Sequence, residues 1–259
     1  MSAELKASRR DATLILTLSN PGARNALHPD MYSAAVETLT TAERDDSIRA
    51  VILTGADNFF CAGGNLNRLL ESSSKDKSVA AEAIERLAGW VNALRDCPKP
   101  VIAAVDGAAA GAGFSLALAC DLIVAGANAK FVMSYARIGL TPDGGASWFL
   151  CRSLPRQLAA EMMMEGKPVL GSRLHQLGLV NRVVPDNTAL DAALAWADEL
   201  AELSPNAVER TKNLLREAQT NSLEQQFELE QHNFIESLHH PEGREGMTAF
   251  LEKRKPIYK

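Results

Sequence analysis

Residues 101–105 (V-I-A-A-V) are apolar at every position, and this run constrains the fold more than any other segment. A strand that is apolar on both faces is typical of a parallel sheet covered by helices on both sides. Further short apolar runs occupy residues 13–18, 50–54, 122–124 and 130–133, and helical patterns occupy residues 29–44, 79–95 and 111–120. This alternation of strands and helices predicts an α/β core.

The pattern changes near residue 155, after which only helical periodicity remains. Cap residues for these helices are expected at Ser172, Asn187, Ser204 and Ser222. Residues 71–77 are polar and serine-rich, which predicts a surface loop. We therefore expect a core over residues 1–200 and a helical C-terminal region over residues 201–259.

Charge and cysteine usage exclude several classes of protein. The chain has 27 Lys and Arg against 32 Asp and Glu, and its dense basic stretch is confined to residues 253–255, so we expect no nucleic-acid partner. The longest weakly polar stretch, residues 107–120, is too short to span a bilayer, and the N-terminal residues lack the apolar run of a signal peptide. The four cysteines form no C-x-x-C pair. We expect a reduced, cytoplasmic protein with no membrane partner.

Three glycine-rich turns follow strands, at residues 62–65, 107–113 and 143–145. In α/β sheets, ligands bind beyond the carboxyl ends of the strands, where helix N-termini present free N–H groups. Two such N–H groups from different turns would form an oxyanion hole. The same glycines would equally serve tight turns and close helix packing, and their spacing leaves both interpretations open.

Other familiar motifs do not fit. The G-A-A-A-G-A-G run at residues 107–113 lacks the Lys-Ser/Thr of a phosphate-binding loop and the glycine order of a dinucleotide fold. Ser115 lies too far beyond the preceding strand for a nucleophile elbow. The five histidines show no ligand spacing, so no metal is expected.

Asp143 is the carboxylate with the most suggestive position, because it follows Pro142 and precedes two glycines and an apolar patch. Apolar surroundings raise the pKa of a carboxyl group and make it a usable general base. An aspartate there would also cap the helix through Trp148 and Phe149, so this alternative stays open.

Two long motifs resemble the crotonase family, the enoyl-CoA hydratase/isomerase superfamily. They are F-C-A-G-G-N-L at residues 60–66 and P-V-I-A-A-V-D-G-A-A-A-G-A-G-F-S-L-A-L-A-C-D at residues 100–121. Shorter matches are N-A-L at residues 25–27, I-G-L-T-P-D-G-G at residues 138–145 and F-L-E-K-R-K-P at residues 250–256. The resemblance covers nearly the whole chain in the expected order.

The resemblance implies a spiral of ββα turns, a C-terminal helical trimerisation region, and a homotrimer or dimer of trimers. It also implies a coenzyme A (CoA) thioester substrate and no separate cofactor, because CoA enters as part of the substrate. The thioester oxygen would lie between the N–H groups of Gly64 and Ala112. The family's substrate-binding segments correspond here to Ala23, Arg24, Ala62, Asn65 and Leu66, with Phe250 and Lys253 contributing from the same or a neighbouring subunit.

Departures from the family pattern bear on the reaction. The family's hydratases use two glutamates to position and split water, and those positions match Ser115 and Tyr135 here. Asp143 matches the working aspartate of several isomerases and of aromatic-acyl-CoA dehalogenases. Asn65 replaces the usual aspartate of the first motif.

The aromatic residues near Asp143 are Tyr135, Trp148 and Phe149, and they favour either a bulky or aromatic acyl group or plain core packing. Residues 142–148 are similar to the corresponding segment of isomerases of phenylacetate catabolism. We predict that Asp143 moves a proton between two carbons of an acyl-CoA, with Tyr135 and Trp148 binding the substrate, so that a double bond shifts or a related rearrangement occurs. The alternatives are a hydratase or ring hydrolase that uses one carboxylate, and a non-catalytic acyl-CoA-binding subunit.

Overall fold

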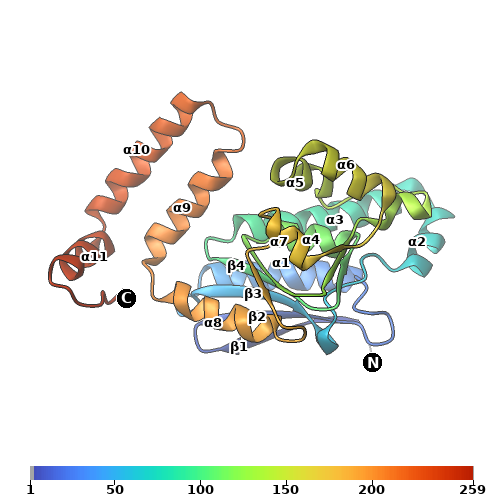
Figure 1. Ribbon diagram of the computed structural model, residues 1–259, viewed down its shortest axis with the longest axis horizontal. Helices are drawn as coiled ribbons and strands as arrows, with labels where there is room; N and C mark the ends of the chain where they lie inside the picture. The colour runs from blue at the N-terminus through green and yellow to red at the C-terminus, as the bar shows by residue number, and fades with distance from the viewer. Residues whose placement is uncertain (1–2, 259) are drawn as a thin grey trace.

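A six-stranded sheet lies at the centre of the molecule, in the strand order β1-β2-β3-β4-β6-β9 (Figure 1). The computed structural model describes residues 3–258. The strands of this sheet are β1 (Glu4–Arg10), β2 (Thr13–Ser19), β3 (Ala50–Gly55), β4 (Val101–Val105), β6 (Leu122–Gly126) and β9 (Arg182–Val184). β1 pairs antiparallel with β2, and all the other pairs are parallel. The carboxyl ends of β2, β3, β4 and β6 therefore share one edge.

A second sheet contains β5 (Ala108–Ala110), β7 (Lys130–Val132) and β8 (Val169–Leu170). After β4 the chain enters β5 and then helix α4 (Ala112–Ala119). After β6 it enters β7 and then the 3₁₀ helix η2 (Ser134–Ile138). Each turn thus contributes one strand to each sheet and then a helix, which is the predicted ββα repeat.

Helices cover both faces of β4. On one face, α1 (Pro29–Glu43) and α3 (Lys77–Asp96) share a core with Val101, Ala103 and Val105. On the other face, α8 (Ala189–Ala201) packs against Ile102 and Ala104. All five residues of β4 are buried, so the predicted two-sided burial is confirmed.

The C-terminal helices extend away from this core (Figure 1). The remaining helices are η1 (Ala56–Asn58), α2 (Leu66–Ser73), α5 (Ala146–Ser153), α6 (Arg156–Glu165), α7 (Gly171–Gln176), α9 (Pro205–Glu217), α10 (Leu223–His239) and α11 (Pro241–Leu251). α9 to α11 fall within the region expected to be helical from residue 201. Over residues 3–258, no helix is both long and apolar enough to cross a bilayer.

Several local predictions need correction. β1 was not expected, because its exposed, charged residues are typical of an edge strand and carry no apolar pattern. Part of the expected loop at residues 71–77 is the end of α2, and the two- and three-residue strands β8 and β9 interrupt the region expected to be all helical.

The helix caps were predicted with mixed success. Ser204 and Ser222 do cap α9 and α10, the latter through a capping box. Ser172 lies inside α7, and Thr188, not Asn187, precedes α8, so those two predictions are wrong.

Candidate active site

Two chain segments come together beyond the carboxyl ends of β3 and β4. Cys61 pairs with Ala109, so that its N–H donates to the carbonyl of Ala108 at 2.9 Å and its carbonyl accepts from the N–H of Ala110 at 2.9 Å. Leu27 in turn donates its N–H to the carbonyl of Gly63 at 2.8 Å. These bonds hold the first glycine-rich turn against the second.

The close approach requires glycine. Gly63 has a φ of +88°, and a Cβ built there would lie 2.5 Å from the carbonyl oxygen of Ala110 and 3.4 Å from the nitrogen of Ala112. A Cβ at Gly113 would lie 2.6 Å from the Cβ of Cys61. The glycines therefore set the close spacing of the two turns, as the interpretation of tight turns and close packing predicts, and the oxyanion hole stays a prediction.

The N–H groups of Gly64 and Ala112 are the candidate oxyanion donors. Ala112 is the first residue of α4, where N–H groups lack acceptors within the helix. Within residues 3–258, neither of these two N–H groups has a hydrogen-bond acceptor. The structure thus brings the predicted pair together on adjacent turns and leaves both donors available to a ligand oxygen.

Asp143 is fixed beside this pair by two side chains. The Tyr135 hydroxyl donates to Oδ1 of Asp143 at 2.6 Å, and the Ser115 hydroxyl donates to the backbone carbonyl of Asp143 at 2.9 Å. Ser115 lies one helical turn beyond Ala112 on α4, and the Tyr135 ring lies against Gly111, where a built Cβ would be 3.5 Å away. Both anchors therefore lie within a turn of a predicted oxyanion donor.

The structure decides against Asp143 as a helix cap. The position before α5 is Gly145, with a φ of +79°, and no side chain caps this helix. Gly144 also has a positive φ of +57°, and a Cβ there would lie 2.8 Å from the Cβ of Ser115. The two glycines thus turn the chain so that the Asp143 carboxylate faces Tyr135 and not the helix.

Burial raises the pKa of Asp143, while the hydrogen bond from Tyr135 acts in the opposite direction. Burial also raises the pKa of Tyr135, and the neighbouring Asp143 charge adds to that rise. Tyr135 therefore stays protonated and donates to the carboxylate throughout the neutral range. Asp143 is a base whose pKa is moved toward neutrality, as a proton carrier requires. Tyr135 holds Asp143, and its predicted contact with the substrate stays a prediction.

A pocket of about 320 Å³ opens next to Gly64, between the start of α1, α2 and the first half of α3. Tyr32 and Arg68 line it. Burial raises the pKa of Tyr32 to about 12, and the Asp143 charge contributes, so this hydroxyl stays a hydrogen-bond donor. Neither residue was predicted from the sequence, because nothing in their spacing connects them to residues 60–66 or to Asp143.

Asn65 and Leu66 connect this pocket to the oxyanion turn. The Asn65 side chain caps α2 by accepting from the N–H groups of Asn67 at 3.1 Å and Arg68 at 3.3 Å. Leu66 begins α2 and is exposed. Asn65 thus caps α2 as an aspartate would, but it carries no negative charge.

Arg24 and Ala62 line a second pocket, of about 600 Å³, which also contains Lys130. The N–H of Ala62 donates to the carbonyl of Arg24 at 3.0 Å. Ala23 belongs to the same turn and is half-buried. The segment 62–64 therefore has a pocket lined by Arg24, Lys130 and Asp186 at one end and the pocket of Tyr32 and Arg68 at the other.

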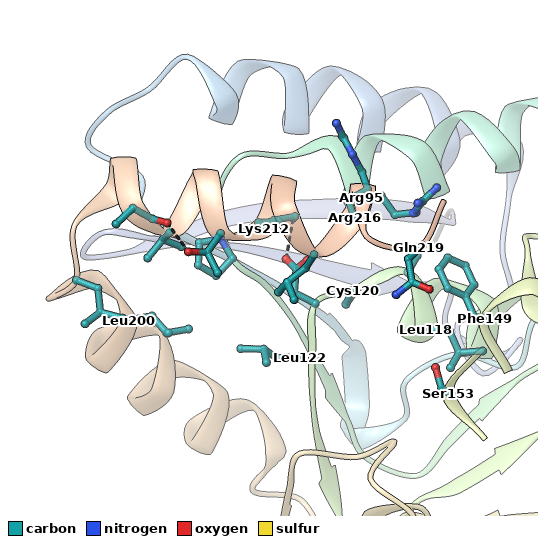
Figure 2. A pocket seen from close by; sticks show the side chains of 18 of the residues that line it. Arg95, Leu118, Cys120, Leu122, Phe149, Ser153, Leu200, Lys212, Arg216 and Gln219 are labelled. Atoms are coloured by element: carbon teal, nitrogen blue, oxygen red, sulfur yellow. Dashed lines mark hydrogen bonds and ion pairs between the residues drawn. The ribbon is translucent and has the colours of Figure 1, made fainter. Parts of the chain in front are cut away.

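Trp148 lies in a different place. It lines a pocket of about 810 Å³ between α5 and α9, with Arg95 and Arg152 against its ring at 4.9 and 4.1 Å. Figure 2 shows how Arg95, Phe149 and Arg216 approach this pocket from α3, α5 and α9. Within one chain, Trp148 does not share the pocket of Gly64, and its substrate-binding role stays a prediction.

Phe250 and Lys253 also lie away from Gly64 within one chain. Phe250 is 83% exposed on α11, which Figure 1 shows at the opposite end of the molecule from α2. Among the residues that the structure describes, no three His, Cys, Asp or Glu side chains are grouped to hold a metal ion.

Comparisons with known proteins agree with this architecture. The model of the family described as enoyl-CoA hydratase/isomerase matches residues 9–259. The crystal structure of an enoyl-CoA hydratase from Polaromonas sp. JS666 is 52% identical, covers 99% of this chain and 100% of that chain, and has a TM-score of 0.98. This likeness confirms the predicted fold class.

Two curated relatives from Escherichia coli (strain K12) differ in reaction. The chain is 37% identical over 256 residues to 2,3-dehydroadipyl-CoA hydratase, and the aligned region covers 99% of this chain and 98% of that protein. It is also 37% identical over 246 residues to 1,2-epoxyphenylacetyl-CoA isomerase, and that aligned region covers 95% of this chain and 94% of that protein. Identity alone therefore does not select between a hydratase and an isomerase.

Proposed function

Because this chain belongs to the enoyl-CoA hydratase/isomerase family and is an acyl-CoA enzyme, we propose that it shifts a double bond, or performs a related rearrangement, in an enoyl- or ring-derived acyl-CoA. One observation carries this proposal: a single carboxylate, Asp143, is held by Tyr135 at 2.6 Å beside two free backbone donors.

The thioester binds with its carbonyl oxygen between the N–H groups of Gly64 and Ala112. These donors are fixed before the reaction and are stronger partners for an enolate oxygen than for a neutral carbonyl oxygen. They therefore lower the barrier to removing a proton from the neighbouring carbon. Neither donor requires a side chain, which agrees with glycine and alanine at these positions.

Asp143 carries the proton. Its carboxylate takes a proton from the substrate carbon, the C–H electron pair moves into the conjugated enolate, and the negative charge rests on the thioester oxygen. The Asp143 carboxylic acid then returns the proton to a different carbon, and the double bond is left at its new position. One group of suitable pKa suffices for both steps.

Water addition has weaker support at this site. The family's hydratases use two glutamates, and Ser115 and Tyr135 stand in those positions. A serine hydroxyl is not a base near neutral pH, and Tyr135 is occupied as a donor to Asp143. A one-carboxylate hydratase or ring hydrolase is therefore the second candidate, and a non-catalytic acyl-CoA-binding subunit is the third.

The two pockets around residues 62–64 support a path for the substrate. The pocket of Arg24 and Lys130 suits the phosphates of coenzyme A, since both side chains are cationic. The pocket beside Gly64 then takes the acyl group. Coenzyme A enters as part of the substrate, and the proposed reaction needs neither a further cofactor nor a metal.

We further propose a homotrimer or a dimer of trimers built through the C-terminal helices. Phe227, Phe234, Phe250 and Leu251 are large apolar side chains that are more than half exposed on α10 and α11. Such a surface is typical of a protein interface. In this assembly Phe250 and Lys253 would reach a CoA site of a neighbouring subunit.

The test is turnover of paired substrates in deuterated water. We expect 3-hexenoyl-CoA to isomerise with deuterium entering carbon, and crotonyl-CoA to be hydrated slowly or not at all. Asp143→Asn should keep the fold and the binding of CoA but lower kcat by at least ~10²-fold.

Two results would count against the proposal. Hydration of crotonyl-CoA at roughly 10 s⁻¹ or more would favour the one-carboxylate hydratase. Asp143→Asn turnover within a few-fold of the parent enzyme would remove Asp143 from the mechanism.

A further inference from the structure

The acyl pocket contains a cation that the proposed chemistry does not use. Arg68, Lys75 and Arg86 line the pocket together with two acidic residues, Glu71 and Glu82. Arg86 and Glu82 pair with each other at 2.5 Å. Arg68 forms no ion pair with any carboxylate in residues 3–258, and its guanidinium turns to His28 on α1's N-terminal side instead.

Two residues at the start of α1 orient this guanidinium. Nη1 of Arg68 lies 2.9 Å from Nε2 of His28, and Nδ1 of His28 lies 3.2 Å from a carboxylate oxygen of Asp30. Nδ1 also accepts from the backbone N–H of Asp30 at 3.3 Å, so the His28 side chain caps α1. The His28 ring thus lies between the Arg68 guanidinium and the Asp30 carboxylate. The ring positions Arg68, which has no direct carboxylate partner in residues 3–258.

The location of Arg68 in the acyl pocket bears on which part of the substrate it would bind. Gly64, the proposed oxyanion donor, lines the same pocket, and so does Tyr32, whose pKa is raised by the Asp143 charge and lowered by the Arg68 charge. Arg68 follows Gly64 by four residues, in the first turn of α2, so it lines the acyl pocket close to the proposed oxyanion donor. An apolar chain end would leave this cation without a partner, whereas a carboxylate matches the two parallel donors of a guanidinium.

We infer that Arg68, oriented by His28, selects acyl-CoA substrates that carry a carboxylate at the end of the acyl chain remote from the thioester. This inference rests on the proposed acyl-CoA site and narrows its substrate class to the mono-CoA thioesters of dicarboxylic acids. Arg68 is a specificity residue that binds the substrate without taking part in proton transfer.

Binding of saturated thioesters tests the inference without requiring turnover. Isothermal titration calorimetry compares succinyl-, glutaryl- and adipyl-CoA with butyryl-, valeryl- and hexanoyl-CoA, so that each pair has the same chain length and differs at the chain end. We expect the best dicarboxylic member to bind about tenfold more tightly than its partner, equivalent to ~1.4 kcal/mol. Arg68→Leu should abolish this preference, and Arg68→Lys should keep part of it, since lysine retains the charge but not the paired donors.

Arg216→Leu is the control, because Arg216 is also a cationic side chain but lines the separate pocket between α5 and α9. It should leave the preference unchanged. The inference is overturned if the parent enzyme shows no preference in any pair, or if Arg68→Leu weakens both members of each pair equally, which would place Arg68 on a CoA phosphate. If none of the six thioesters binds, the proposed acyl-CoA site itself is wrong.

Discussion

Replacing Tyr135 with phenylalanine isolates the hydrogen bond that defines this site. The change removes the hydroxyl 2.6 Å from Oδ1 of Asp143 and keeps the ring that lies against Gly111. A bond of this length, from a hydroxyl to a carboxylate, is of the strong charge-assisted kind. It stabilises the ionised form of Asp143, so its removal leaves the effect of burial unopposed and raises the pKa of Asp143 further.

The expected size follows from the strength of such bonds. Hydrogen bonds to charged groups contribute about 1.5–3 kcal/mol, and one pKa unit corresponds to ~1.36 kcal/mol. Because Asp143 is partly exposed and water can replace part of the lost bond, we expect the lower end, a rise of about one pKa unit. Proton removal needs the carboxylate, so activity is lost as the pH falls through this pKa, and the acid limb moves to higher pH.

Two assays measure this shift. The first is kcat/KM for isomerisation of a 3-enoyl-CoA across the acid and neutral range. The second is carbon-13 NMR titration of aspartate carboxyl groups, with the Asp143 signal assigned through Asp143→Asn. Ser115→Ala is the control, because Ser115 binds the backbone carbonyl of Asp143 and not its carboxylate, and it should leave the limb in place. A Tyr135→Phe limb that stays fixed, or moves to lower pH, would refute the argument.

Two further substitutions test the framework around the site. Gly63→Ala should lower kcat by about 10²-fold, because its Cβ would meet the Ala110 carbonyl and separate the two donor turns, whereas Gly22→Ala, with a similar φ of +81° and open space around it, should keep activity. Lys212→Met should lower the free energy of unfolding by about 2–3 kcal/mol in urea denaturation, since Lys212 pairs with Asp121 at 2.7 Å and is 12% exposed. Arg216→Met, which breaks the more exposed Arg216–Asp96 pair on the same helix, should lower the free energy of unfolding by under ~1 kcal/mol. Equal losses from Lys212→Met and Arg216→Met would contradict the role of burial.

The parts of the fold that sequence predicts are those that local chemistry determines. β2, β3 and β4 are largely apolar runs that end at glycine, proline or polar residues. Ser204 and Ser222 cap their helices by accepting hydrogen bonds from backbone N–H groups three residues further on, so the sequence nearby identifies both caps. β5, β8 and β9 have only two or three residues, so no periodicity identifies them. Their strand conformation comes from partners distant in sequence, such as Ala125 opposite Val183.

The same distinction applies to the candidate site. The backbone donors and Asp143 were predicted, because they lie in glycine-rich turns with a specific family pattern. The partner of Asp143 was not, since Tyr135 is eight residues away and only the turn through Gly144 brings the two side chains together. Arg68 and Tyr32 were missed for a similar reason, because α1 and α2 meet only in the folded chain.

The two departures from the hydratase pattern are coupled through Asp143. Ser115 and Tyr135 are the residues predicted to match the glutamates of the family's hydratases, and here Ser115 binds the backbone of Asp143 and Tyr135 binds its carboxylate. A glutamate in place of Tyr135 would set a second negative charge against Asp143, which would raise the pKa of one carboxyl and remove the donor that holds it. A glutamate in place of Ser115 would also need room where Gly144 already lies within contact distance. Two glutamates and Asp143 would therefore compete for one volume, which supports the proposal of a site with one working carboxylate.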